Sequence, residues 1–275
     1  MANFHVLTSP DTTIPAQTSV RRIGFSDIRY ALQKGLEDFM AMPTHLAFLG
    51  MIYPLFGLCL GALTFSSNGL PLLFPLVSGF ALVGPVAAVG LYELSRRREL
   101  GLDTSLSHVF DVLRSPSLPA IVALGVALMV IFVAWLMAAQ MLYQSLYGST
   151  VPDSYTGFLY EVLTTRRGWT MIVLGHAIGF VFALAAFSIG VVSFPLLLER
   201  DVGAIHAVQT SVHAVMSNPG PMALWALVIA GLLMIGSAPL LVGLAIVMPV
   251  LGHASWHFYR RVVDPSADLN PRPRD

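Results

Sequence analysis

The sequence predicts an all-α polytopic membrane protein, a transmembrane bundle of six helices with cytoplasmic N and C termini. Charged residues make up only 11% of the chain, and its mean hydropathy is +0.74. Asp, Glu, Lys and Arg are absent from four long runs that together cover roughly two thirds of the sequence. A soluble domain cannot hide so much uncharged surface, so lipid is the expected solvent. The four runs are 39–92, 115–152, 168–198 and 202–259.

The runs divide into spans according to their length. A helix needs about 20 apolar residues to cross the hydrocarbon core, so the first and last runs are each long enough for two crossings. Turn-forming residues divide both of these runs, Ser66-Ser67-Asn68-Gly69 in the first and Gly236-Ser237-Ala238-Pro239 in the last. Each middle run supplies one crossing. The expected helices are 46–66, 70–94, 118–146, 169–198, 221–237 and 239–259.

Basic residues predict the orientation of these helices. Six crossings place both termini on one side of the membrane, and thirteen of the fifteen Lys and Arg residues lie on that side. Only Arg166 and Arg167 lie on the opposite side. Because Lys and Arg accumulate in cytoplasmic loops, both termini are expected in the cytoplasm. The formal net charge of zero conceals this asymmetry and gives no indication of nucleic-acid binding.

The chain also repeats one pattern loosely three times. Each unit begins with a cytoplasmic amphipathic segment, reaches an X-Pro step that ends the segment, and then enters a helical hairpin. Helical spacing of the apolar residues suits a helix in the membrane interface, with its stripe in lipid or against the bundle. The stripes are Phe25, Ile28, Leu32, Leu36 and Phe39; Leu106, Val109, Phe110 and Leu113; and Ile205, Val208, Val212 and Val215. The units span about 21–98, 102–200 and 201–263.

Two further features complete the predicted organisation. Residues 1–20 and 264–275 are expected to be disordered cytoplasmic tails, which flank a six-span membrane domain over 21–263. Between the third and fourth spans, apolar residues from Tyr155 to Leu163 follow helical spacing, and Asp153 or Ser154 can cap them. We expect a short helix there that lies on the outer face as a surface anchor.

Two segments resemble a known family. The closing segment Pro249-Val-Leu-Gly-His253-Ala-Ser-Trp256-His257-Phe-Tyr-Arg260-Arg261 and the entry segment 27–43 are similar to bacterial predicted integral membrane proteins catalogued as domain of unknown function 2189. The resemblance extends from about residue 22 to residue 263. It implies a multi-pass protein of the bacterial inner membrane, and it implies no reaction, substrate or cofactor.

A candidate metal site lies near the cytoplasmic end of the last span. His253 and His257 are four residues apart on one helical face, a spacing that can offer two imidazoles to one metal or haem iron. If the units pack side by side, Glu93 and Glu199 would lie at similar depth and complete the site, with His45 close by. The alternative is that all these groups lie at the headgroup level, where water, phosphate and loop backbone satisfy them.

The motif content favours a non-enzymatic function. The sequence contains no phosphate-binding loop, no nucleophile elbow, no His-Glu-x-x-His and no C-x-x-C pair, and no loop long enough for a catalytic domain. Gly57-x-x-x-Gly61 and Gly175-x-x-x-Gly179 permit close helix packing, within the chain or with a partner. The expected function is therefore an accessory, assembly or scaffold subunit that acts in the lipid bilayer on another membrane protein, requires no cofactor and is not an enzyme. The alternatives are a channel or transporter for a small solute and a metal- or haem-binding membrane protein.

Overall fold

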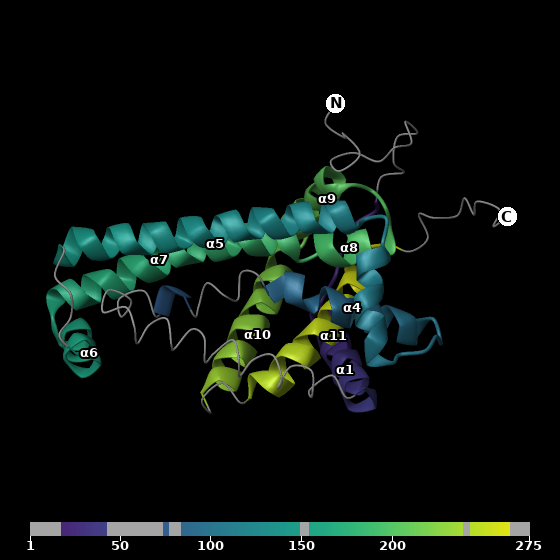
Figure 1. The fold of residues 1–275 in the computed structure, drawn as a ribbon, viewed down its shortest axis with the longest axis horizontal. Coiled ribbons are helices and arrows are strands. Elements are labelled where there is room, and N and C mark those ends of the chain that lie inside the picture. Colours follow the sequence, from purple (N-terminus) through teal and green to yellow (C-terminus); the bar gives the residue numbers. More distant parts are fainter. Residues whose placement is uncertain (1–17, 43–73, 77–83, 149–153, 239–242, 265–275) are drawn as a thin grey trace. The chain divides into compact units, whose positions relative to one another are not determined.

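The computed structural model describes residues 18–42, 74–76, 84–148, 154–238 and 243–264. In this part of the chain it is all-helical, with ten helices and no strand (Figure 1). The helices are α1 (Phe25–Ala41), α4 (Gly84–Glu99), the 3₁₀-helix η4 (Leu106–Arg114), α5 (Leu118–Tyr147), α6 (Tyr155–Thr164), α7 (Arg166–Gly190), α8 (Ser193–Glu199), α9 (Ala204–Ser217), α10 (Pro219–Ser237) and α11 (Leu244–Val262). The chain forms two compact units, one of residues 1–50, 85–124 and 188–275 and one of residues 51–84 and 125–187.

The first unit is built on the contact between α1 and α11, which lie side by side (Figure 1). Gly35 of α1 lies against the backbone of α11, where a Cβ added to it would be 2.5 Å from the nitrogen of Ala254. Glycine is required at this point because no side chain fits between the two backbones. On its other side α11 packs against α10, where the rings of Phe258 and Trp225 stack with their centroids 4.7 Å apart.

The second unit pairs the later part of α5 with most of α7 (Figure 1). A Cβ on Gly179 would lie 3.1 Å from the ring of Trp135, and one on Gly175 would lie 3.7 Å from Leu142. The indole nitrogen of Trp135 donates a hydrogen bond to the carbonyl oxygen of Pro75 at 2.9 Å. Both glycines thus lie against side chains of α5, and the close approach of two helix backbones that Gly175-x-x-x-Gly179 permits stays a prediction.

Three helical segments of the described residues are long and apolar enough to cross a membrane: 118–147, 166–199 and 219–237. They correspond to the expected spans 118–146, 169–198 and 221–237. The expected span 46–66 lies outside the described residues, and of 70–94 only 74–76 and 84–94 are described. The last expected span, 239–259, is described from residue 243, and α11, although 19 residues long, is not among the segments apolar enough to cross a membrane.

One continuous helix was expected over 169–198, but the segment 166–199 is interrupted. It is divided at residues 191 and 192, where α7 ends and α8 begins. Pro195 explains this break, because its ring clashes with the carbonyl four residues earlier, at Val191, and it has no N–H to donate. The Ser193 hydroxyl donates to the Ile189 carbonyl oxygen at 2.5 Å across the break, and Ser211 of α9 accepts the N–H of Val192 at 3.1 Å.

The short helix expected between the third and fourth spans is confirmed as α6. The Ser154 hydroxyl caps it by accepting the N–H of Gly157 at 3.1 Å. The ring of Phe158 lies edge-on to Tyr143 and Tyr147 near the end of α5, with centroid distances of 6.1 and 6.2 Å. This aromatic contact attaches α6 to α5.

The inner ends of the two predicted tails pair with each other. Val20 and Val263 form an isolated antiparallel bridge, in which the N–H of Arg21 donates to Val262 and that of Asp264 donates to Ser19. The Arg21 and Asp264 side chains form an ion pair at 2.6 Å. Residues 18–20 and 264 are thus ordered, while 1–17 and 265–275 lie outside the described residues. The threefold division into units, which rests on sequence similarity alone, stays a prediction.

Candidate functional site

The most buried polar group of the first unit surrounds Asp38, where α1, α4 and α11 meet. Asp38 is only 4% exposed. The Ser95 hydroxyl donates to its Oδ2 at 2.6 Å, and His257 Nε2 lies 2.8 Å from the same oxygen. Arg98 donates to Oδ1 at 2.6 Å. Behind Ser95, His253 is fully buried and its Nδ1 lies 2.8 Å from the Ser95 oxygen. We call these five residues the Asp38 cluster.

Asp38 is the charged centre of this cluster. Burial raises the pKa of its carboxyl, but the hydrogen bonds from His257 and Ser95 and the charge of nearby histidines lower it by more. The net result is a pKa below the ordinary aspartate value, so the carboxylate is ionised at neutral pH. The Ser95 hydrogen is committed to Asp38, which leaves the His253 nitrogen to donate to the Ser95 oxygen. The direction of each bond therefore follows from the negative charge on Asp38.

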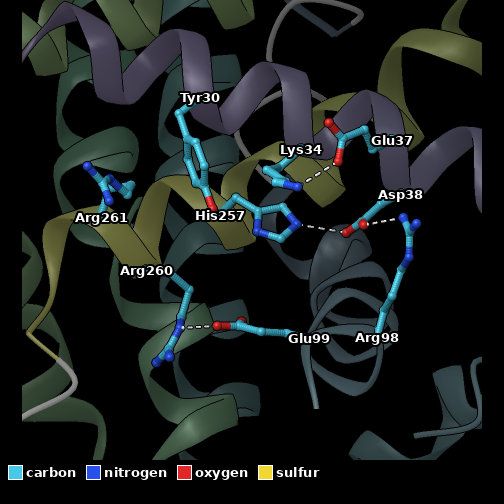
Figure 2. Close-up of a pocket in the computed structure, with 9 residues that line it drawn as sticks. All are labelled: Tyr30, Lys34, Glu37, Asp38, Arg98, Glu99, His257, Arg260 and Arg261. Atoms are coloured by element: carbon cyan, nitrogen blue, oxygen red, sulfur yellow. Dashed lines mark hydrogen bonds and ion pairs between the residues drawn. The ribbon is translucent and has the colours of Figure 1, made fainter. Parts of the chain in front are cut away.

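A pocket of about 440 Å³ adjoins this cluster (Figure 2). Its walls come from α1, α4 and α11, and it shares Asp38, Arg98 and His257 with the Asp38 cluster. Four cations and three carboxylates line it, and each carboxylate lies next to a cation. The pairs are Lys34 with Glu37 at 2.7 Å, Arg98 with Asp38 at 2.6 Å and Arg260 with Glu99 at 3.1 Å. The fourth cation, Arg261, binds Asp27 at 2.6 Å.

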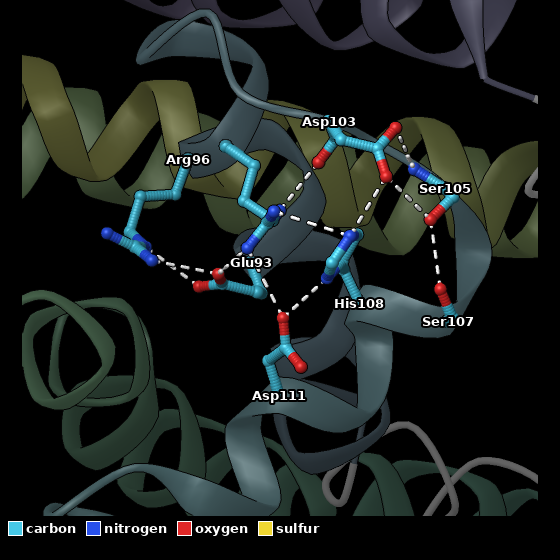
Figure 3. Close-up of polar contacts among 8 residues, drawn as sticks. Glu93, Arg96, Asp103, Ser105, Ser107, His108 and Asp111 are labelled. Carbon is cyan, nitrogen blue, oxygen red and sulfur yellow. Dashed lines mark hydrogen bonds and ion pairs between the residues drawn. The ribbon is translucent and has the colours of Figure 1, made fainter.

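A second polar network joins α4 to η4 (Figure 3). Glu93 is 3% exposed and receives two hydrogen bonds from Arg96, at 2.7 and 2.8 Å. His108 lies between two carboxylates, with Nδ1 2.6 Å from Asp111 and Nε2 2.9 Å from Asp103. These contacts, the one to Asp111 above all, raise the pKa of the His108 imidazole. This network attaches η4 to the end of α4.

A third network joins α8 to α11. Glu199 accepts hydrogen bonds from the Tyr259 hydroxyl and from Arg260. Arg260 also donates to Glu99 at 3.1 Å, and the indole of Trp256 donates to the same carboxylate at 2.9 Å. Tyr259 is fully buried. Glu199 thus ties the end of α8 to the last turn of α11.

The structure therefore distributes the predicted metal-site residues among three networks. His253 and His257 join the Asp38 cluster, Glu93 pairs with Arg96, and Glu199 pairs with Tyr259 and Arg260. Among the described residues, no group of three or more His, Cys, Asp or Glu side chains is arranged to hold a metal ion. His45 lies outside these residues. Metal or haem binding by the four side chains stays a prediction from sequence.

Sequence reasoning missed Asp38, the residue that organises the cluster. The predicted carboxylates, Glu93 and Glu199, directly follow apolar runs, whereas Asp38 directly precedes one. One pattern in the sequence does point to this residue. Ile28, Ala31, Gly35 and Asp38 follow helical spacing, which places the Asp38 carboxylate on a face of small and apolar residues in an otherwise charged helix.

Comparison with known proteins gives one result. The family described as "Predicted integral membrane protein (DUF2189)" matches residues 72–199, a little under half of the chain. This is the family that the sequence resembles, although both segments on which the resemblance was based lie outside the matched residues. No curated protein and no solved structure matches the chain. Together with the three candidate spanning segments of the described residues, the match identifies an integral membrane protein with several apolar helices.

Proposed function

We propose that this integral membrane protein is a non-enzymatic accessory, assembly or scaffold subunit that binds another membrane protein through its helices. The proposal includes six crossings of the bacterial inner membrane and two cytoplasmic termini, as the basic residues predict. It is supported by the way in which α10 is packed.

The main support for this proposal is that the rest of the described chain buries little of α10. Only 17% of an apolar 18-residue stretch of α10 is buried inside the protein, against 44% of the corresponding stretch within 166–199. Leu227, Met234 and Ile235 are 68 to 71% exposed. One side of α10 is nevertheless fixed, because Trp225 is fully buried and stacks on Phe258. Among the described residues, α10 is thus held on one side and uncovered on the other, and it presents a rigid apolar surface to the membrane.

Small residues on α10 favour a helix as the binding partner. A Cβ added to Gly231 would meet no atom within 4 Å. Helix association in lipid depends on close packing at small residues rather than on hydrophobic burial, because lipid tails are as apolar as the helix. A spanning helix of a partner protein can approach α10 closely at this glycine.

The polar networks support a structural function. The carboxylates that line the pocket are already bound by cations or by His257. Glu37 pairs with Lys34 within α1, whereas Asp38 and Glu99 bind residues of other helices, so their charges join helices. The buried Asp38 of α1 binds Arg98 of α4 and His257 of α11, and such contacts require good geometry to offset the desolvation of the carboxylate. They would hold the cytoplasmic ends of the helices in a fixed arrangement for a partner.

Photo-crosslinking from α10 tests the proposal. A photoreactive amino acid replaces Leu227 in one variant and the buried Trp225 in a matched control, both at native expression in intact membranes. The expected result is a reproducible adduct with one membrane protein from position 227 that is absent from position 225. Adducts with lipid alone from position 227, combined with purification of a solitary monomer in mild detergent, would contradict the proposal.

A further inference from the structure

The helix α1 has three different faces. Its buried face contains Ile28, Ala31 and Gly35 and lies on α11. A second face exposes large apolar side chains, with Phe25 68%, Leu36 45% and Met40 70% exposed. The third face is polar and forms a wall of the pocket. The predicted stripe is therefore divided, because Ile28 packs inward while Phe25 and Leu36 point away from the protein.

The helix η4 shows the same division for a simple geometric reason. A 3₁₀-helix has three residues per turn, so every third residue lies on one face. Val112 is buried and Val109 contacts Gly90, while Phe110 and Leu113 are 67% and 63% exposed. His108 and Asp111 occupy the polar face. The predicted stripe assumed α-helical spacing and so combined residues from two of these faces.

The helix α9 has the third example of this arrangement. Its buried residues are all small: Ala204, Ala207, Thr210, Ser211 and Ala214. Ile205, Val212 and Met216 are exposed, Met216 by 74%. In soluble proteins large apolar residues normally pack inward and small ones tolerate exposure. The distribution on α9 is therefore the reverse of that expected for a helix of a soluble protein.

We infer that α1, η4 and α9 lie in the membrane interface, attached to the protein by their buried faces, and insert their exposed apolar residues into the lipid. The inserted side chains are Phe25, Leu36 and Met40; Phe110 and Leu113; and Ile205, Val212 and Met216. The ligand is the boundary between headgroups and acyl chains of a phospholipid leaflet. The inference concerns lipid contact and is independent of the partner proposed for α10.

The length of α10 places α9 at this depth. With 19 residues, α10 is about 28 Å long, close to the roughly 30 Å thickness of the hydrocarbon core. Both of its ends must therefore lie at the membrane boundary. Asn218 alone separates the end of α9 from the start of α10. The exposed Met216 lies two residues before this point, where acyl chains meet headgroups.

The helices η4 and α1 also have features that suit a position at the membrane boundary. Only residues 115–117 separate η4 from α5, so η4 ends within about 15 Å of the start of a candidate spanning helix. Arg114 on η4 and Arg29 on α1 are exposed beside the apolar side chains. Interfacial helices gain affinity from buried apolar area and from cations near anionic lipid.

This placement also fixes the direction of the pocket. Lys34 and Leu36 are two residues apart on α1, so they point roughly 200° from each other around the helix. Lys34 lines the charged pocket (Figure 2). When Leu36 is in lipid, Lys34 and this pocket therefore point away from the bilayer. The desolvation cost of inserting these charges is avoided because the apolar and charged sides of α1 are opposed.

Site-directed spin labelling tests the inference in the full-length protein. Cys59 is the only cysteine, so a Cys59→Ser background accepts one label at a time. Each helix offers a neighbouring pair of apolar and polar positions: Leu36→Cys with Lys34→Cys, Leu113→Cys with Arg114→Cys, and Val212→Cys with His213→Cys. The protein is reconstituted in vesicles of phosphatidylethanolamine and phosphatidylglycerol, and relaxation by oxygen, which partitions into lipid, is compared with relaxation by a water-soluble nickel complex.

The expected result is a several-fold preference for oxygen at Leu36, Leu113 and Val212, and a preference for the nickel complex at their polar neighbours. Phe25→Cys, Phe110→Cys and Ile205→Cys repeat the measurement if one of these labels impairs folding. Equal aqueous accessibility at both members of each pair would overturn the inference. Protection of the apolar members from both reagents would also overturn it, because protein rather than lipid would then cover these faces.

Discussion

His257 Nε2 lies 2.8 Å from Asp38 Oδ2, directly beside the point where Gly35 of α1 touches Ala254 of α11. A polar bond and a tight apolar contact therefore hold the same two helices together within one turn. The glycine lets the backbones approach, and the approach brings the carboxylate of one helix within reach of the imidazole of the other. Each contact depends on the geometry that the other provides.

Replacing Asp38 with Asn tests how much the polar contact contributes to the stability of the protein. The change keeps the size of the side chain and removes the negative charge that Ser95, His257 and Arg98 share, so we expect a loss of about 2 to 3 kcal/mol in the free energy of unfolding. Thermal or denaturant unfolding in mild detergent measures it. Glu37→Gln on the same helix is the matched control, because Glu37 pairs with Lys34 at the surface. Equal stability of both variants would contradict the structural importance of Asp38.

The same carboxylate predicts how stability changes with pH. The pKa of folded Asp38 lies below its ordinary value, since the hydrogen bonds from His257 and Ser95 outweigh the effect of burial. As the pH falls, the unfolded chain therefore binds this proton first. The stabilisation from Asp38 is present above the ordinary value and is lost as the pH falls through the folded value. Melting curves between neutral pH and about pH 3 should show a smaller acid-induced loss in Asp38→Asn than in the unaltered protein.

Gly35→Ala tests the apolar contact. The new Cβ would lie 2.5 Å from a backbone atom of α11, which cannot move aside as a flexible side chain could. We expect a destabilisation of about 1 to 3 kcal/mol from overpacking. Gly231→Ala is the matched control, because a Cβ there meets nothing within 4 Å, and alanine gains about 0.5 to 1 kcal/mol of helix propensity over glycine. Similar melting temperatures for the two variants would show that α1 and α11 are not in close contact.

His108 predicts a loss of stability on the alkaline side. Its contacts with Asp111 and Asp103 raise the pKa of the imidazole above 6.5, although Arg97 opposes them. The stabilisation is fully present below the ordinary histidine pKa and is lost as the pH rises through the raised value. His108→Gln should therefore remove part of the stability difference between weakly acidic and weakly alkaline pH. An NMR titration of the imidazole that gives a pKa below 6.5 would contradict the network in Figure 3.

Tyr259→Phe removes only the hydroxyl that donates to Glu199. The ring stays in place, so we expect a loss of about 1.5 to 3 kcal/mol in the free energy of unfolding, the contribution of one hydrogen bond to a charged acceptor. Tyr160→Phe is the matched control on an exposed ring of α6, with 72% of its surface accessible. Unfolding of both variants in detergent should show a change for Tyr259 alone.

The extent of the spans could be predicted because charge is excluded from lipid. The helix expected over 118–146 ends within one residue of α5, and the one expected over 221–237 starts two residues after α10 begins. The cap of α6 at Ser154 was predictable for a similar reason, since a hydroxyl before an apolar helical pattern satisfies a free N–H. These features depend on local chemistry alone.

The site could not be predicted in the same way. The packing face of α1 is set by Gly35, which excludes every larger side chain, whereas the sequence pattern draws attention to Phe25 and Leu36. The spacing of His253 and His257 correctly places both on one side of α11, but the Asp38 carboxylate that His257 meets is 219 residues distant in the chain. A tertiary contact of that separation leaves no periodic signal in one sequence.

The bridge between Val20 and Val263 constrains the parity of the membrane topology. Two segments that share backbone hydrogen bonds must emerge from the same leaflet, whichever leaflet that is. An odd number of traversals would separate them by the thickness of the bilayer. We therefore expect an even number of traversals, whereas the described residues contain three candidate spanning segments. Reporter fusions to the two ends should always give matching signals.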